Sequence, residues 1–149
     1  MKPRAMNAFD YLFMGALIVE IFTVIVGWDW IAMGIHEHVA AQGGGPDMQV
    51  FFSGLVPWFI AFDLLLAFAL WAFISVFRWS FWRIILAVFV ALEVVSLLQE
   101  IVDPIGEFWF LASALLSTGL RVAAVVFVFQ GEAGAWLRQD RADAAAVFK

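Results

Sequence analysis

The stretch that decides the fold is VFFSGLVPWFIAFDLLLAFALWAFISVF, residues 50–77, in which Asp63 is the only charged residue. A helix needs about 20 consecutive apolar residues to cross the hydrocarbon core of a bilayer, and this stretch is longer than that. Three further stretches meet the same requirement, at residues 8–33, 81–102 and 108–129. The sequence therefore predicts an all-α, polytopic membrane protein: a single domain, residues 1–149, built as a four-transmembrane-helix antiparallel bundle.

The composition agrees with a membrane protein and excludes several chemistries. Of the 149 residues, 65% are hydrophobic and 14% charged, whereas about 25% of the residues in a soluble domain are charged. The chain has no cysteine, which excludes disulfides, thiol nucleophiles and Cys-based metal sites. It also lacks the HExxH, CxxC and phosphate-loop motifs and a Ser-His-Asp order, so nothing indicates an enzyme or a cofactor. A net charge of −5 gives no reason to expect a nucleic-acid partner.

Local sequence signals predict where the helices end. Asn7, with Asp10 three residues later, resembles the cap of a helix start. Residues 34–49, which contain Gly43-Gly44-Gly45-Pro46, are expected to form the one substantial loop. The run Asp103-Pro104-Ile105-Gly106 is expected to break the chain between the third and fourth helices.

The placement of lysine and arginine predicts the orientation. With four crossings both termini lie on one side, and the opposite side has no lysine or arginine. The positive-inside rule then places both termini and the turn at Arg78 in the cytoplasm, and residues 34–49 and 103–107 outside. Residues 131–149 are expected to form a short cytoplasmic tail at the membrane interface. The bases on the cytoplasmic side are Lys2, Arg4, Arg78, Arg83, Arg138, Arg141 and Lys149.

The eight tryptophans fit the aromatic belts of a membrane protein better than a ligand site. Most of them lie close to a predicted membrane boundary, and Trp71 lies about one turn deeper. The outer group is Trp28, Trp30, Trp58 and Trp109, and the inner group is Trp79, Trp82 and Trp136.

The most informative feature is one ionisable residue in the middle of each predicted helix: Glu20, Asp63, Glu93 and Arg121. Counted at 1.5 Å per residue from the cytoplasmic ends, they lie about 13 to 21 Å deep, so all four can share one slab. Hydroxyl side chains three or four residues away extend the polarity along the same helix faces. These supporting residues are Thr23, Ser96, Ser113 and Ser117.

Two interpretations of these charges remain open, because an unpaired charge at the bilayer centre is costly and should face inward towards a partner. In the first, Arg121 pairs with one acid, and the protein is a non-enzymatic accessory subunit or self-associating bundle. In the second, three acids against one arginine form a site for a cation, a proton, a lipophilic amine or a lipid, and the protein is a transporter or a binding protein. The expected partners are the lipid bilayer and either a second copy of the chain or other membrane subunits.

His36-Glu37-His38 is the only other cluster with ligand chemistry. Imidazole and carboxylate groups suit zinc or copper. In a helix, however, residues two apart point about 200° away from each other. His36 and His38 could therefore share one metal only from an extended loop, so the sequence predicts no metal site.

Two family resemblances complete the sequence reading. The run Phe73–Ile85 (FISVFRWSFWRII), together with Val126–Leu137 (VFVFQGEAGAWL), resembles small bacterial four-helix inner-membrane proteins, in which a basic turn joins the middle helices. That resemblance covers the second half of the chain and implies bacterial origin and topology. Pro57-Trp58-Phe59 followed by Asp63 resembles one helix of the emopamil-binding-like proteins, which hold amines or sterols between acidic helices; here the spacing to the acid differs.

Overall fold

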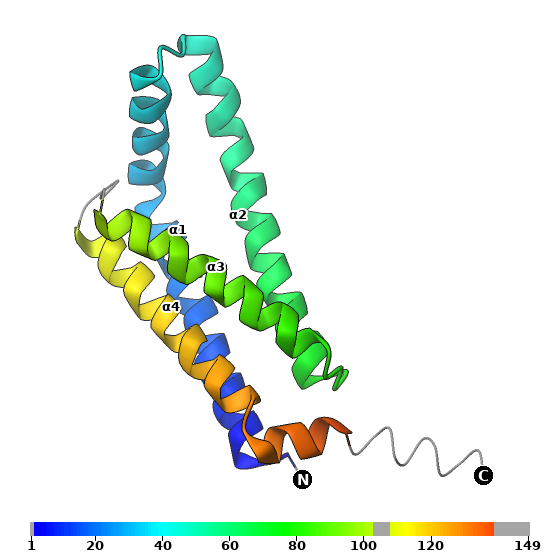
Figure 1. The fold of residues 1–149 in the computed structure, drawn as a ribbon. Coiled ribbons are helices and arrows are strands. Elements are labelled where there is room, and N and C mark those ends of the chain that lie inside the picture. The colour runs from blue at the N-terminus through cyan, green and yellow to red at the C-terminus, as the bar shows by residue number, and fades with distance from the viewer. Residues whose placement is uncertain (1, 103–107, 139–149) are drawn as a thin grey trace.

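A computed structural model describes residues 2–102 and 108–138 of the chain. They form four long helices, α1 (Arg4–Ala41), α2 (Pro46–Ser75), α3 (Trp82–Val102) and α4 (Phe108–Val128), followed by a short helix at residues 131–138 (Figure 1). No strand occurs within these two ranges. The predicted all-helical class is therefore confirmed.

All four long helices are long and apolar enough to cross a membrane, which is consistent with a multi-pass membrane protein. α3 and α4 have 21 residues each, about 31 Å of helix, which matches a hydrocarbon core of about 30 Å. α1 and α2, with 38 and 30 residues, are longer than this core requires. Their joined ends therefore project beyond the α3–α4 hairpin (Figure 1).

The connection between α1 and α2 is much shorter than the predicted loop at residues 34–49. α1 continues through His36-Glu37-His38 to Ala41, and α2 begins at Pro46. Proline is favoured in the first helical turn because its missing N–H would be unpaired there. Gly43 adopts a φ of +78°, and the N–H of Gly44 donates to the Val39 carbonyl at 2.9 Å, which is a glycine-based helix ending. The predicted loop is therefore wrong over residues 34–41 and 46–49, which are helical, because polar side chains do not by themselves end a helix.

The start of α1 also differs from the prediction. The helix begins at Arg4 with Pro3 as the N-cap residue, and no side chain caps it, so the predicted cap at Asn7 and Asp10 was wrong. The predicted turn at residues 103–107 and residues 139–149 of the predicted tail lie outside the described residues.

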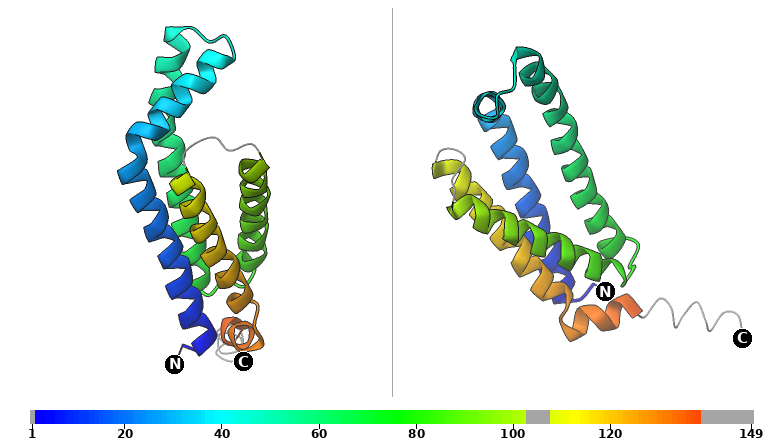
Figure 2. Two further views of the ribbon diagram at one scale, coloured as in Figure 1. Left: turned by 90° about the vertical axis from the view of Figure 1, so that its left-hand side faces the viewer. Right: turned by 45° about the horizontal axis from the view of Figure 1, so that its top comes forward.

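The helices form two hairpins that meet at one end and diverge at the other. α1 packs most extensively on α4, while α2 and α3 contact each other less than α1 contacts α2 or α3 contacts α4. The hairpins converge near the N-terminus and the α2–α3 turn, and they spread apart towards the α1–α2 connection (Figure 2). The main cluster of buried apolar residues lies at the converging end, where it includes Phe9, Phe13, Leu70, Leu86 and Val128.

A polar cluster centred on Asp10 closes the converging end. The Asp10 carboxylate accepts hydrogen bonds from Trp71 Nε1 at 3.0 Å and from Ser75 Oγ at 2.5 Å, and it pairs with Lys2. These contacts fasten α2 to the first turns of α1. Trp71, predicted as part of the aromatic belts, is thus a hydrogen-bond donor in this cluster.

The short helix at residues 131–138 packs into the same end of the molecule. Trp136, predicted as an interfacial residue, is 8% exposed and belongs to the core cluster. The Arg78 guanidinium lies 4.3 Å and the Lys2 ammonium 5.7 Å from the centre of the Trp136 ring, within the range of cation–π attraction. This part of the predicted tail is therefore packed against the helices.

Gly27 tests the contact between α1 and α4. A Cβ atom at this position would lie 2.6 Å from Phe110 Cζ and 2.7 Å from Trp109 Cη2, so we expect Gly27→Leu to lower the free energy of unfolding by about 1–3 kcal/mol through overpacking. Gly34 lies on the same helix with open space around it, and Gly34→Leu should be at least as stable as the parent. Thermal unfolding in detergent measures both, and equal melting of the two variants would contradict this contact.

Candidate functional site

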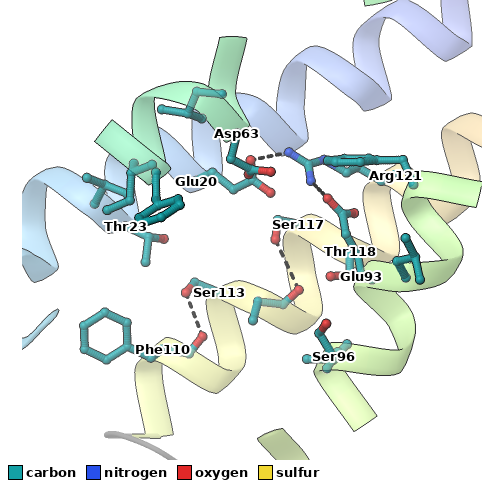
Figure 3. Close-up of a pocket in the computed structure, with 18 residues that line it drawn as sticks. Glu20, Thr23, Asp63, Glu93, Ser96, Phe110, Ser113, Ser117, Thr118 and Arg121 are labelled. Atoms are coloured by element: carbon teal, nitrogen blue, oxygen red, sulfur yellow. Dashed lines mark hydrogen bonds and ion pairs between the residues drawn. The ribbon is translucent and has the colours of Figure 1, made fainter. Parts of the chain in front are cut away.

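The four ionisable residues predicted in the middle of the helices all line one open cavity of about 660 Å³. Each helix contributes one of them: Glu20 from α1, Asp63 from α2, Glu93 from α3 and Arg121 from α4 (Figure 3). The four predicted hydroxyl residues, Thr23, Ser96, Ser113 and Ser117, line the same cavity. The spacing argument therefore identified eight residues that the fold brings together.

The cavity begins where the apolar core ends. On α1 the last core residue is Leu17 and the first cavity residue is Glu20. On α4 the core residue Ala124 lies one turn from Arg121. The tightly packed end thus forms the floor of the cavity, and the divergence of the two hairpins provides its volume.

Arg121 is the centre of the charge network. Its side chain is 2% exposed, and its guanidinium donates to Glu93 Oε1 through Nη1 and to Glu20 Oε2 through Nη2. The guanidinium carbon also lies 5.8 Å from the centre of the Phe13 ring and 5.6 Å from that of Phe89. The Arg121 guanidinium therefore links α4 to both α1 and α3.

The network leaves two buried polar atoms without a hydrogen-bond partner in the described part of the chain, Glu93 Oε2 and Arg121 Nε. An unsatisfied buried donor or acceptor typically costs about 1–3 kcal/mol. The ion pairs therefore do not saturate the polar groups at the base of the cavity.

Asp63 has a different environment from the other two acids. Its side chain is exposed, and it makes no hydrogen bond or ion pair with any residue in 2–102 or 108–138. Its carboxylate lies beside that of Glu20 (Figure 3), and the two negative charges repel each other. If all four groups are ionised the cavity carries a formal charge of −2, and Asp63 is the acid whose charge no arginine neutralises.

Three of the hydroxyl groups bond back to their own helices. Thr23 donates to the Val19 carbonyl at 2.8 Å, Ser113 to Phe110 at 2.8 Å and Ser117 to Ala114 at 3.2 Å. With the proton used in this way, each hydroxyl oxygen still has a lone pair that can accept a bond from a group in the cavity. The wall facing a ligand is therefore rich in acceptors.

The sequence did not identify four further residues that line the cavity: Phe59, Phe89, Phe110 and Thr118. Thr118 could have been found, because it lies three residues before Arg121 and so shares its helix face. The phenylalanines carried no signal, because aromatic residues occur throughout all four apolar segments.

The two histidines lie elsewhere. Both are on α1, so the extended loop that joint metal binding would require is not formed. His36 lines a second cavity of about 440 Å³ together with Trp28, and His38 Nε2 lies 2.8 Å from Gln42 Nε2. Within the described ranges, no three His, Asp or Glu residues are grouped so that they could hold a metal ion.

Comparison with known proteins adds no relative: no family model, curated protein or solved structure matches this chain. The family resemblances of the sequence therefore stay predictions.

The network at Arg121 predicts a pattern of couplings. Arg121→Leu should lower the free energy of unfolding by about 3–5 kcal/mol, because the two acids stay partly buried without their partner. Adding Glu93→Gln or Glu20→Gln should recover part of that loss, with coupling energies of about 0.5–3 kcal/mol. Asp63→Asn should show a smaller coupling, since Asp63 does not bond to Arg121. Double-mutant cycles from melts in detergent measure these values, and additive losses for all three acids would contradict the network.

Proposed function

We propose that this protein is a non-enzymatic, multi-pass protein of a bacterial inner membrane that binds a lipophilic organic cation, such as an amine, among its four helices. The observation that carries the proposal is the 660 Å³ cavity, which reaches all four charged residues and contains one carboxylate without a counter-ion.

The size of the cavity favours an organic ligand over a bare ion or a proton. Sites for small molecules typically measure about 300–1,000 Å³ and combine apolar walls with a few polar groups. This cavity has that character: Phe59, Phe89 and Phe110 supply aromatic wall, and ring faces attract cations. A proton relay or a site for a bare inorganic ion would need no such volume.

The second candidate is an accessory subunit or self-associating bundle in which the charges only fix helix pairing. The bonds from Arg121 to both Glu20 and Glu93 favour it, because they join three helices. Its partners would be a second copy of the chain or other membrane subunits. In this role Asp63 would have no function, because it bonds to none of the other charged residues of the cavity. A cation site, in contrast, requires a free carboxylate in the cavity.

For the orientation, we propose that the four helices cross the membrane as an antiparallel bundle with both termini in the cytoplasm. Lys2, Arg78 and Arg83 gather at the converging end, where Arg83 Nε donates to the Ser80 carbonyl at 3.1 Å. The α1–α2 connection has no lysine or arginine. The positive-inside rule therefore supports a cytoplasmic converging end.

The binding proposal is tested with benzyltrimethylammonium, a cation that combines an aromatic ring with a quaternary nitrogen. We expect it to raise the melting temperature of the purified protein in a nonionic detergent in a concentration-dependent way, corresponding to about 2.7 kcal/mol at a concentration 100 times Kd. Neopentylbenzene, its uncharged isostere, should have little effect.

Asp63→Asn should abolish that stabilisation, whereas Asp29→Asn, an exposed acid on α1 outside the cavity, should retain it. If the stability of Arg121→Leu/Glu93→Gln is restored but ligand stabilisation is lost, the charges serve binding. If no cation stabilises the parent protein, the purely structural candidate is favoured.

The orientation is tested by cysteine labelling, since the chain has no native cysteine. Gly45 is the suitable position, because its Cβ would meet no atom within 4 Å, whereas one at Gly44 would lie 2.4 Å from Val39 Cγ1. In cells whose outer membrane has been made permeable to the reagent while the inner membrane is intact, Gly45→Cys should react with a membrane-impermeant maleimide. Reaction only after the inner membrane is permeabilised would reverse the assigned topology.

A further inference from the structure

The cavity has its weakest wall between α2 and α3. These two helices contact each other less than any other neighbouring pair, because the hairpins diverge from the α2–α3 turn (Figure 2). Phe59 on α2 and Leu92 on α3 both line the cavity, and they are 66% and 63% exposed. Exposed lining residues on two helices that contact each other so little indicate an opening between them, and Phe59 and Leu92 are called the mouth below.

Both residues of the mouth lie well inside their helices. Leu92 is ten residues from either end of α3, and Phe59 is 16 residues from the end of α2 at the α2–α3 turn. At 1.5 Å per residue, these separations correspond to about 15 and 24 Å of helix. In a bilayer whose hydrocarbon core is about 30 Å thick, the mouth would therefore face lipid chains and not water.

We propose that the cavity takes its ligand sideways from the bilayer, through the mouth, and that the ligand is a single-chain amphiphile with a cationic head. The head pairs with Asp63 beside Glu20, and the alkyl chain leaves between Phe59 and Leu92 into the lipid. This inference rests on the proposed cation-binding function and adds the class of ligand and its route.

The charges favour a cationic head over the zwitterionic head of a common phospholipid. A phosphate in the cavity would lie near the carboxylates of Asp63 and Glu20, and the one base of the cavity, Arg121, is already bonded to Glu20 and Glu93. An ammonium group without a phosphate meets only the attractive part of this arrangement. The acceptor oxygens of Ser113 and Ser117 add hydrogen-bonding capacity for its N–H groups.

The test uses a dodecylammonium probe with a photoreactive diazirine at the end of its chain, added to the full-length protein in phosphatidylcholine nanodiscs. After irradiation, mass spectrometry locates the labelled residues. We expect labelling concentrated on the segments of α2 and α3 next to the mouth. Unlabelled dodecylammonium should compete, whereas dodecanol and dodecanoate should not, because neither supplies a cation for Asp63.

Two matched pairs of variants separate the site from general lipid contact. Asp63→Asn should weaken probe binding roughly 10- to 100-fold, the loss expected for one charge-assisted hydrogen bond, and Asp29→Asn should leave it unchanged. Phe59→Ala should reduce labelling at the mouth several-fold. Phe62→Ala, on the same helix and also 66% exposed but outside the cavity, should not.

The outcomes distinguish this inference from the function on which it rests. If benzyltrimethylammonium stabilises the protein but the probe labels all lipid-facing positions evenly, the lateral route is wrong and the cation site stands. Equal competition by dodecanol would show that the chain alone is recognised, which overturns the cationic head. If neither cation binds, both the inference and the proposed function fail.

Discussion

The arrangement of the helices depends on one buried guanidinium. A buried charge is costly unless it is paired and hydrogen-bonded, and Arg121 meets that condition through Glu20 and Glu93. These bonds bring α1 and α3 against α4 at one depth. Because both acids lie near the middle of their helices, the ion pairs fix the relative height of three helices as well as their neighbours.

α2 is positioned by different contacts. Its side-chain hydrogen bonds to α1 in the described residues run through Trp71 and Ser75 to Asp10, at the converging end. Its middle, where Asp63 lies, is held by packing alone. The hairpins can therefore diverge above the core without breaking an ion pair, and this divergence creates the cavity.

Sequence reasoning could predict the charged centre because charges in apolar segments are rare and energetically constrained. Helix counting placed Glu20, Asp63, Glu93 and Arg121 at similar depth, and the fold brings them to one cavity. The pairing of Arg121 with two acids at once could not be predicted, since it depends on the rotation of each helix about its axis. For the same reason, the sequence could not show which phenylalanines line the cavity or on which side the cavity is open.

The errors at the helix ends have a common physical cause. Residues 34–41 are helical although they follow the apolar segment, because hydropathy indicates where lipid contact ends and not where helical hydrogen bonding ends. The role of Asp10 was missed for a similar reason: its partners Lys2 and Ser75 are 8 and 65 residues away in the sequence, and only the packing of the N-terminus on α2 joins them.

Asp63 distinguishes a structural from a functional origin of the charges. Arg121 already has a partner on two helices, so a third acid adds no bond to the fold, and its carboxylate increases the repulsion at Glu20. If α2 crosses a membrane as proposed, an aspartate at its middle costs about 2.5–3.5 kcal/mol on insertion scales. A residue that lowers the stability of the fold without any structural gain is typical of a functional site. The position of Asp63, exposed on the wall of the cavity, is therefore the observation that most favours the proposed cation site over a purely structural role.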